Sequence, residues 1–171
     1  YIHIPFCVRK CEYCDFLSFP ADDDAKLRYV KGLMAEMIFY GPLMKNYQVS
    51  SVYIGGGTPS SIDEQWIAAL MEGVFDCFNV LPDAEISIEC NPGTLSREKL
   101  LAYRDAGINR LSIGLQSANN DELKLLGRIH TFEQFVTNYE VARNVGFKNI
   151  NVDLMYGLPG QSASQYMATV N

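Results

Sequence analysis

The sequence lacks several features that would point to common classes of function. No apolar run approaches the roughly 20 residues of a membrane-spanning helix, so we expect no integral membrane segment. Basic residues are outnumbered, with 14 Lys and Arg against 20 Asp and Glu, and the net charge of −6 argues against nucleic-acid binding. Low-complexity segments and repeats are also absent. What remains is a chain of 171 residues with ordinary apolar content, long enough to fold around one core.

Cysteine is the most informative residue type that is present. Three of the five cysteines lie close to the start of the sequence, where Cys7, Cys11 and Cys14 are spaced C-x3-C-x2-C. This odd, closely packed set does not suit a disulfide framework, so we expect a reduced, cytoplasmic protein. A structural zinc site and an ordinary four-iron cluster each require four protein ligands. Three thiolates would leave one iron of a cluster open, and the alternative is a zinc site that borrows a ligand such as His3.

Strand-like and helical segments alternate along the chain. Apolar or alternating runs predict strands at 1–6, 51–54, 85–90, 110–116 and 148–154. Helical spacing and capping residues predict helices at 26–40, from a Ser61–Glu64 capping box to Phe78, from Ser96 to Gly107, from a Thr131–Gln134 capping box to Gly146, and from 165 onward. Repeated strand–helix units imply a parallel sheet. Five strands are too few to close an eight-stranded barrel, and a doubly wound sheet is one architecture that the pattern allows.

Polar residues and glycines stand at the ends of these predicted strands. Cys7 follows the first strand, Gly55–Thr58 follow the second, Glu89 and Gln116 end the third and fourth, and Asp153 lies near the end of the fifth. Because parallel strands end at the same edge of a sheet, we expect these residues to meet at one rim. The glycine segment is not a phosphate loop, since no Gly-Lys-Ser/Thr follows it. Taken alone, it fits a tight turn between a strand and a helix.

The cysteine spacing resembles that of the radical S-adenosylmethionine (SAM) superfamily. Further segments occur in a characteristic order: YIHIPFC at the start, IGGGTPS at 54–60, ECNPG at 89–93, NRLSIGLQS at 109–117, LGR at 126–128 followed by His130, and DLMYGLPG at 153–160. Together they resemble the family of oxygen-independent coproporphyrinogen III oxidases and their haem-chaperone relatives, over nearly the whole chain. The resemblance implies an α/β fold, a partial (β/α)6 TIM-like barrel of the radical SAM type. We expect residues 1–171 to be an incomplete radical SAM core domain, truncated after about five β/α units, with the C-terminal region absent.

The resemblance also implies two cofactors. Cys7, Cys11 and Cys14 would bind three irons of a [4Fe–4S] cluster, and the amino and carboxylate groups of SAM would bind the fourth. An electron from a donor such as flavodoxin would then allow the cluster to cleave SAM into methionine and a 5′-deoxyadenosyl radical. The protein's part is to position these groups and to exclude water and oxygen.

Positions that contact SAM in the family correspond here to Tyr1, Tyr13, Gly56, Gly57, Thr58, Glu89, Gln116, Arg128, Asp153 and Met155. The glycine segment would lie near the methionine amino group, and Glu89 and Gln116 near the ribose and methionyl groups. Arg128 carries a donor fork that matches a carboxylate, while Tyr13 and Met155 would lie on the adenine side. Simpler interpretations stay open: helix caps for the acceptors, a solvated side chain for Arg128 and core packing for the aromatic rings. His130 could equally cap a helix or lie at the surface.

The residues that follow the third cysteine separate two branches of this family. The oxidase branch usually carries another cysteine two residues after the third, whereas Asp15 and Phe16 follow Cys14 here. Cys-Asp-Phe is typical of the haem-chaperone branch, so we predict a SAM-binding haem chaperone. Such a protein would bind porphyrin or haem and pass haem to respiratory acceptor proteins, and whether it is also an enzyme stays open. A true coproporphyrinogen III oxidase and a structural zinc-binding α/β module are the alternatives.

Overall fold

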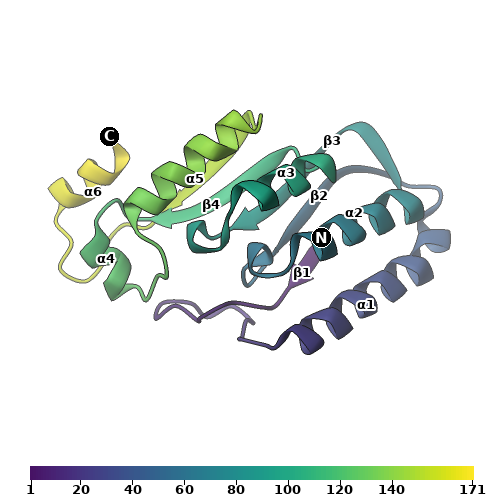
Figure 1. Ribbon diagram of the computed structural model, residues 1–171, viewed down its shortest axis with the longest axis horizontal. Coiled ribbons are helices and arrows are strands. Elements are labelled where there is room, and N and C mark those ends of the chain that lie inside the picture. Colours follow the sequence, from purple (N-terminus) through teal and green to yellow (C-terminus); the bar gives the residue numbers. More distant parts are fainter.

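Five parallel strands, arranged in chain order, form the centre of the structure (Figure 1). The computed structural model describes all 171 residues, and the strands are β1 (Ile2–Ile4), β2 (Gln48–Gly56), β3 (Asn79–Cys90), β4 (Arg110–Gln116) and β5 (Asn149–Leu154). Each strand pairs in parallel with the next one along the chain. A doubly wound sheet would reverse this order at one point. Because right-handed crossovers without a reversal place every helix on the same face, the sheet is an open partial barrel.

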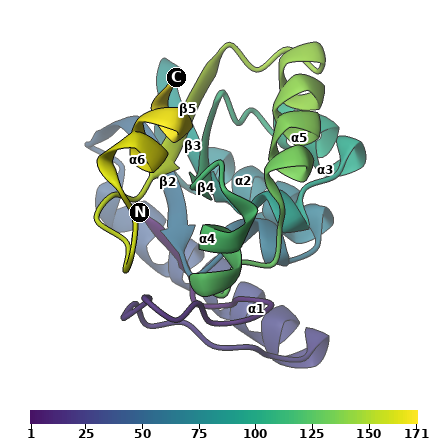
Figure 2. The ribbon, with the colours of Figure 1, turned by 90° about the vertical axis from the view of Figure 1, so that its left-hand side faces the viewer.

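Helices cover one face of this sheet. Along it lie α1 (Asp23–Tyr40), α2 (Glu64–Cys77), α3 (Arg97–Asp105) and α5 (Phe132–Asn144), and each packs against the next. The short helices α4 (Asn120–Leu125) and α6 (Ala163–Val170) lie together at the end of the molecule where β4 and β5 terminate (Figure 2). No helix combines the length and the apolar character that crossing a membrane would require.

The hydrophobic core lies between the sheet and these helices. Alternate residues of the strands point into it, and Ile54, Ile88 and Leu111 are fully buried there. From the helices, Ile67 and Leu100 pack against them and are equally buried. Burial of each such side chain contributes about 1.5–3 kcal/mol relative to exposure. The core therefore fixes which residues of each strand point to the opposite face.

That opposite face carries polar side chains and forms the inside of the partial barrel. In β3 the predicted alternation is confirmed, because Ile86, Ile88 and Cys90 are buried in the core while Glu85 and Glu89 face the other way.

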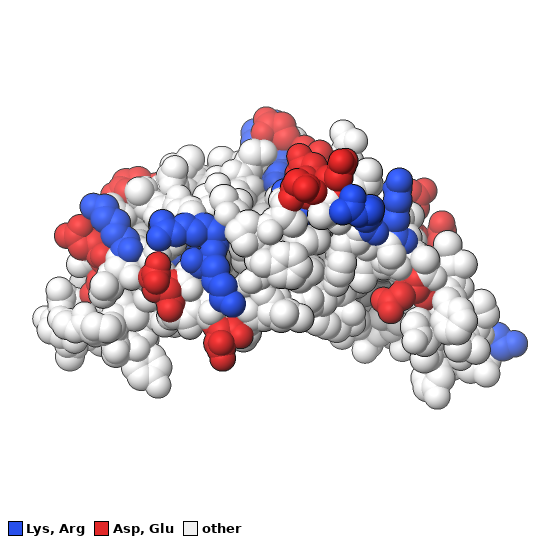
Figure 3. Space-filling model, turned by 90° about the horizontal axis from the view of Figure 1, so that it is seen from below, with Lys and Arg blue, Asp and Glu red and all other residues white.

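Seen from below, the molecule is arched, and acidic and basic side chains are interspersed on this view (Figure 3). A continuous basic stripe of the kind that binds nucleic acid does not cross this view.

The predicted elements are present, with several corrections at their ends. Thr131 and Gln134 form the predicted capping box, and Gly107 and Gly146 follow the ends of α3 and α5 with φ values of +88° and +104°. The capping box predicted at Ser61 is wrong, because Asp63 caps α2 by accepting a hydrogen bond from the Gln65 N–H at 2.8 Å.

Further differences concern short segments. Ser61 lies in a 3-10 turn (Pro59–Ser61), which the glycine segment leads into, so it is not free to cap the helix. Phe78 ends α2 as an extended residue instead of continuing its apolar stripe. Helix α4 was not predicted, since a helix of 6 residues is too short to show a clear apolar period.

Candidate functional site

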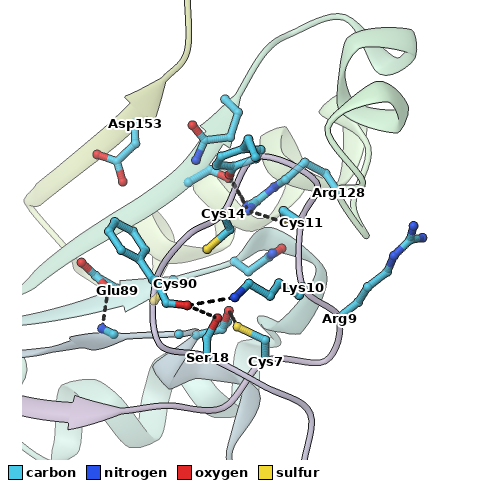
Figure 4. Close-up of a pocket in the computed structure, with 18 of the residues that line it drawn as sticks. Cys7, Arg9, Lys10, Cys11, Cys14, Ser18, Glu89, Cys90, Arg128 and Asp153 are labelled. Carbon is cyan, nitrogen blue, oxygen red and sulfur yellow. Dashed lines mark hydrogen bonds between the residues drawn. The ribbon is translucent and has the colours of Figure 1, made fainter.

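A single pocket at the carboxyl ends of the strands contains most of the predicted site residues (Figure 4). Its walls include Cys7, Cys11, Tyr13, Cys14, Gly56, Gly57, Thr58, Glu89, Gln116, Arg128 and Asp153. These residues come from every strand end and from the loop after β1, although they are far apart in the sequence. The structure brings them together at one rim, as the parallel topology predicts.

Two predicted site residues do not line the pocket. Tyr1 is largely exposed and stacks on Tyr53, with ring centroids 6.2 Å apart and an angle of 23° between the rings. Met155 borders the site through its backbone, since its N–H donates to the Gln116 carbonyl at 2.9 Å. Tyr1 therefore reaches the pocket only indirectly, through the ring of Tyr53.

The loop that carries the three cysteines is tied to two parts of the fold. Its two ends are joined where the Cys7 N–H donates to the Phe19 carbonyl at 3.1 Å and the Phe19 N–H donates to the Pro5 carbonyl at 3.0 Å. Its middle is attached beyond α4, because the Glu12 N–H donates to the Leu126 carbonyl at 3.1 Å. These hydrogen bonds keep the loop over the strand ends, so that its thiols line the pocket.

All three thiols are free and partly buried. No three His, Cys, Asp or Glu side chains converge closely enough to hold a single metal ion. A tetrahedral zinc ion with Zn–S bonds of about 2.3 Å would require its sulfurs to lie within about 4 Å of one another. The three thiols thus line one pocket without gathering at the spacing that a single zinc ion requires.

The glycine segment is pressed against β1 and the cysteine loop. A Cβ atom on Gly57 would lie 2.8 Å from the Phe6 carbonyl oxygen and 3.1 Å from the Cys7 sulfur. Gly56 has a φ of +120°, in the left-handed region that side chains disfavour. The N–H groups of Gly57 and Thr58 donate to the carbonyls of Ile4 and Phe6, both at 2.8 Å. Glycine is therefore required here to place Cys7, whatever ligand the segment meets.

Glu89 is held from two sides at the end of β3. Its Oε1 accepts a hydrogen bond from the Tyr53 hydroxyl at 2.8 Å. Its Oε2 accepts one from the Gly56 N–H at 2.9 Å (Figure 4). Burial, together with the hydrogen bond to Glu89 and its negative charge, raises the pKa of Tyr53 to about 12. The phenol therefore keeps its proton and remains a donor to Glu89.

Arg128 points into the pocket and contacts the cysteine loop. One terminal nitrogen lies 3.7 Å from the Cys11 sulfur and 3.4 Å from the Tyr13 hydroxyl, and the other donates to the Gly114 carbonyl at 2.6 Å (Figure 4). Its Nε is buried and has no partner. The interpretation of Arg128 as a solvated side chain is therefore wrong. Burial raises the pKa of Tyr13, and the positive charge of Arg128 partly offsets this rise.

Gln116 and Asp153 complete the rim at the last two strands. Gln116 has a φ of +73°, rare for a residue with a side chain, and follows a register shift between β4 and β5. Such irregularities re-aim side chains at the ends of strands. The side-chain amide of Gln116 passes over Gly114, where a Cβ would lie only 2.8 Å from it. Asp153 accepts hydrogen bonds from Ser112 at 3.2 Å and from Asn151 at 2.7 Å.

The surroundings of His130 exclude the two alternatives left open for it, a helix cap and a surface side chain. It is 4 % exposed, and its Nε2 lies 3.3 Å from the Leu115 carbonyl oxygen. Burial, followed by the positive charge of Arg128, lowers the pKa of His130 to about 4. The ring is therefore neutral near pH 7, and the cap of α5 is Thr131 instead.

Sequence reasoning missed several residues of the pocket wall: Arg9, Lys10, Phe16, Ser18, Cys90, Asn91, Ser112 and Gly114. Ser112 and Gly114 could have been predicted, because side chains alternate between the two faces of a strand and these two positions share a face of β4 with Gln116. The loop residues carry no periodic signal. Cys90 is buried on the core side, and burial raises the pKa of its thiol, which agrees with leaving it outside the ligand set.

Comparisons with known proteins agree with this geometry. The Radical SAM superfamily profile matches residues 1–171. The heme chaperone HemW of Bacillus subtilis is 39% identical over 172 residues, covering 100% of this chain and 45% of the relative. The heme chaperone HemW of Escherichia coli is 40% identical over 171 residues, covering 96% of this chain and 44% of the relative. The chain thus spans less than half the length of these curated relatives.

A solved structure gives the same result for the fold. The coproporphyrinogen III oxidase HemN from Escherichia coli, described as a radical SAM enzyme, superposes with a TM-score of 0.92 and 34% identity. The match covers 99% of this chain and 39% of that one. The sheet is thus a partial TIM-like barrel of the radical SAM type, and family membership implies SAM and a [4Fe–4S] cluster as cofactors. The chain belongs to the radical SAM superfamily, and within it is similar to HemW heme chaperones and to HemN.

Proposed function

We propose that residues 1–171 are the radical SAM core domain of a haem chaperone, and that the pocket at the strand ends binds a [4Fe–4S] cluster together with SAM. The observation that carries the proposal is the meeting of three free thiols, a partly buried arginine and several strand-end acceptors around one pocket. The similarity to HemW proteins adds the link to haem.

Cys7, Cys11 and Cys14 would hold the cluster through three of its irons. When bound, the cluster and SAM would supply one-electron, radical chemistry. The chain contributes position and electrostatics. Arg128 places a positive charge 3.7 Å from the Cys11 sulfur, which stabilises the negative charge of a thiolate. The Thr58 hydroxyl, 3.3 Å from the Cys7 sulfur, can donate to a second thiolate.

The remaining pocket groups complement a zwitterionic nucleoside. The N–H groups of Gly56, Gly57 and Thr58 already donate to acceptors within the protein. The glycine segment can therefore offer a ligand only its oxygen acceptors, which suit the ammonium group of SAM. Arg128 Nε, buried without a partner, is a donor available for a carboxylate. Glu89, Gln116 and Asp153 would accept hydrogen bonds from hydroxyl and amino groups. Tyr13 lies beside Arg128, with 3.4 Å between its hydroxyl and a terminal nitrogen of the arginine, and its ring would pack against adenine.

Two functions share this pocket, and the loop after Cys14 favours one of them. Phe16 occupies the position where the oxidase branch carries its further cysteine, and it is 70% exposed at the pocket. This favours a haem chaperone, which would take haem or a related porphyrin, receive electrons from a donor such as flavodoxin and pass haem to respiratory acceptors. The 34% identity to HemN keeps a true coproporphyrinogen III oxidase as the second candidate. A cytoplasmic location is part of this proposal, because a cluster requires its thiols to be kept reduced.

Anaerobic reconstitution of the full-length protein with iron and sulfide tests the cluster assignment. We expect Cys11→Ala to lose the four-iron cluster, whereas Cys77→Ala, a matched control at a partly buried thiol outside the loop, should retain it. A full cluster in Cys11→Ala would contradict the proposal. Titration with haem and an anaerobic decarboxylation assay with coproporphyrinogen III then separate the two candidate functions. Haem binding without decarboxylation supports the chaperone, and decarboxylation supports the oxidase.

A further inference from the structure

Tyr53 does not line the pocket, and it is not among the positions that the family resemblance assigns to SAM binding. It lies on β2, opposite Ser87 of β3 in the sheet register, and points to the inside of the partial barrel. Glu89 follows Ser87 by two residues, so its side chain projects from the same face one step nearer the strand ends. The phenol of Tyr53 therefore reaches Glu89 from the amino-terminal side of the strand ends, and Tyr53 itself does not line the pocket.

The two hydrogen bonds to Glu89 fix the orientation of its carboxylate. The Tyr53 hydroxyl donates to Oε1 at 2.8 Å and the Gly56 N–H donates to Oε2 at 2.9 Å. A carboxylate can accept about four hydrogen bonds, so each oxygen keeps acceptor capacity for a ligand in the pocket. With both oxygens anchored, this capacity points in a fixed direction. Without the phenol, only the backbone donor would restrain the carboxylate.

The neighbouring residues are arranged so that Tyr53 can take this position. A Cβ atom on Gly55 would lie 2.8 Å from the Tyr53 ring and 3.0 Å from Glu89 Oε2. Gly55 has no left-handed φ, so the reason for glycine here is space and not backbone conformation. On its other side the ring stacks on Tyr1, at 6.2 Å between centroids. Tyr53 is thus held between a position with no side chain and an aromatic ring.

Burial and the surrounding charges keep the phenol in its donor form. Burial is the largest cause of the raised pKa of Tyr53, and the charges of Glu89 and Asp153 raise it further, while Arg110 opposes them. The phenol consequently donates to Glu89 throughout the pH range in which the protein would function. Tyr1 has a structural role in this arrangement, because it stacks on the Tyr53 ring whose hydroxyl donates to Glu89.

We propose that Tyr53 is a positioning residue for SAM, acting through Glu89, whose carboxylate it holds in the direction that SAM requires. The proposal rests on the proposed SAM site and assigns a residue outside that site to its affinity. It predicts that removal of the phenol oxygen weakens SAM binding while the cluster, which Tyr53 does not approach, remains complete. Loss of one hydrogen bond to a charged group corresponds to about a tenfold rise in the dissociation constant for SAM.

The experiment uses the full-length, anaerobically reconstituted protein and equilibrium dialysis with labelled SAM. Tyr53→Phe should retain wild-type iron content and bind SAM about tenfold more weakly. At saturating SAM, its electron paramagnetic resonance spectrum should match that of the wild type. The matched control is Tyr103→Phe, which removes a fully buried phenol whose oxygen has no hydrogen-bond partner, and which should bind SAM normally.

A double-mutant cycle separates positioning from a general structural effect. If Tyr53 acts through Glu89, adding Tyr53→Phe to Glu89→Ala, which removes the acceptor, should weaken SAM binding by less than about twofold beyond the single change. Additive effects, an unchanged affinity in Tyr53→Phe or a loss of iron from that variant would each overturn the proposal. A wild-type protein with a complete cluster and no affinity for SAM would overturn the proposed function itself, and is recognised before any variant is compared.

Discussion

Replacement of Gly57 by alanine is the most sensitive test of how the glycine segment positions the cluster loop. The added Cβ would lie 2.8 Å from the Phe6 carbonyl oxygen and 3.1 Å from the Cys7 sulfur, where ordinary contacts begin at 3.4 Å. The carbonyl cannot move away easily, because it accepts hydrogen bonds from the Thr58 N–H at 2.8 Å and the Ser61 hydroxyl at 3.2 Å. The strain must therefore displace the segment or the first cysteine.

Overpacking of this kind costs about 1–3 kcal/mol. For a domain of 171 residues that corresponds to a decrease of about 3–10 °C in the melting temperature. Because Cys7 is one of the two nearest groups, we also expect lower iron content after reconstitution of Gly57→Ala. Thermal unfolding followed by circular dichroism and a colorimetric iron assay measure the two effects separately.

Gly32→Ala is the matched control for the same chemical change. Gly32 is exposed within α1, and nothing lies within 4 Å of the position its Cβ would take. Alanine favours a helix interior over glycine by about 1 kcal/mol, so this variant should be slightly more stable and should bind iron normally. A wild-type melting temperature together with full iron content in Gly57→Ala would refute the reasoning.

Two further predictions concern residues near the end of β4. Arg128→Lys keeps the charge but loses the fork that spans Cys11, Tyr13 and Gly114, so SAM should bind about tenfold more weakly in equilibrium dialysis; an unchanged affinity would contradict its assignment. His130 has its pKa lowered to about 4 in the folded protein, so it binds a proton more readily when the protein is unfolded. Its contribution to the free energy of unfolding is therefore complete above pH 6.5 and is lost as the pH falls toward 4. The folded protein should therefore lose about 2 kcal/mol between pH 7.5 and pH 5. Urea unfolding at both values should show a smaller loss in His130→Gln, and equal losses in the two proteins would exclude His130 as the cause.

Most of the fold could be predicted from the sequence because local and tertiary preferences agree. The alternation in β3 and the capping box at Thr131 are local patterns, and both are present in the structure. The choice between a doubly wound sheet and a partial barrel depends on strand order, which residue periodicity does not contain. Strand order in the structure and the superposition on HemN both give the barrel that family resemblance implied.

The parts of the site that could not be predicted depend on contacts between distant residues. The burial of His130 follows from its packing beneath β4, beside the Leu115 carbonyl, which no local pattern reveals. Tyr53 looks like an ordinary strand residue until the sheet register places it below Glu89. The positive φ of Gln116 arises from the register shift beside Gly114, and no glycine or turn sequence marks it.

The central claim is that the three thiols hold a four-iron cluster whose open iron binds SAM. Its most direct test is electron paramagnetic resonance of the reduced, anaerobically reconstituted full-length protein, before and after addition of SAM. We predict a four-iron signal that changes its g values when SAM is added. A complete cluster whose signal does not respond to saturating SAM, or zinc bound in place of iron and sulfide, would contradict the account.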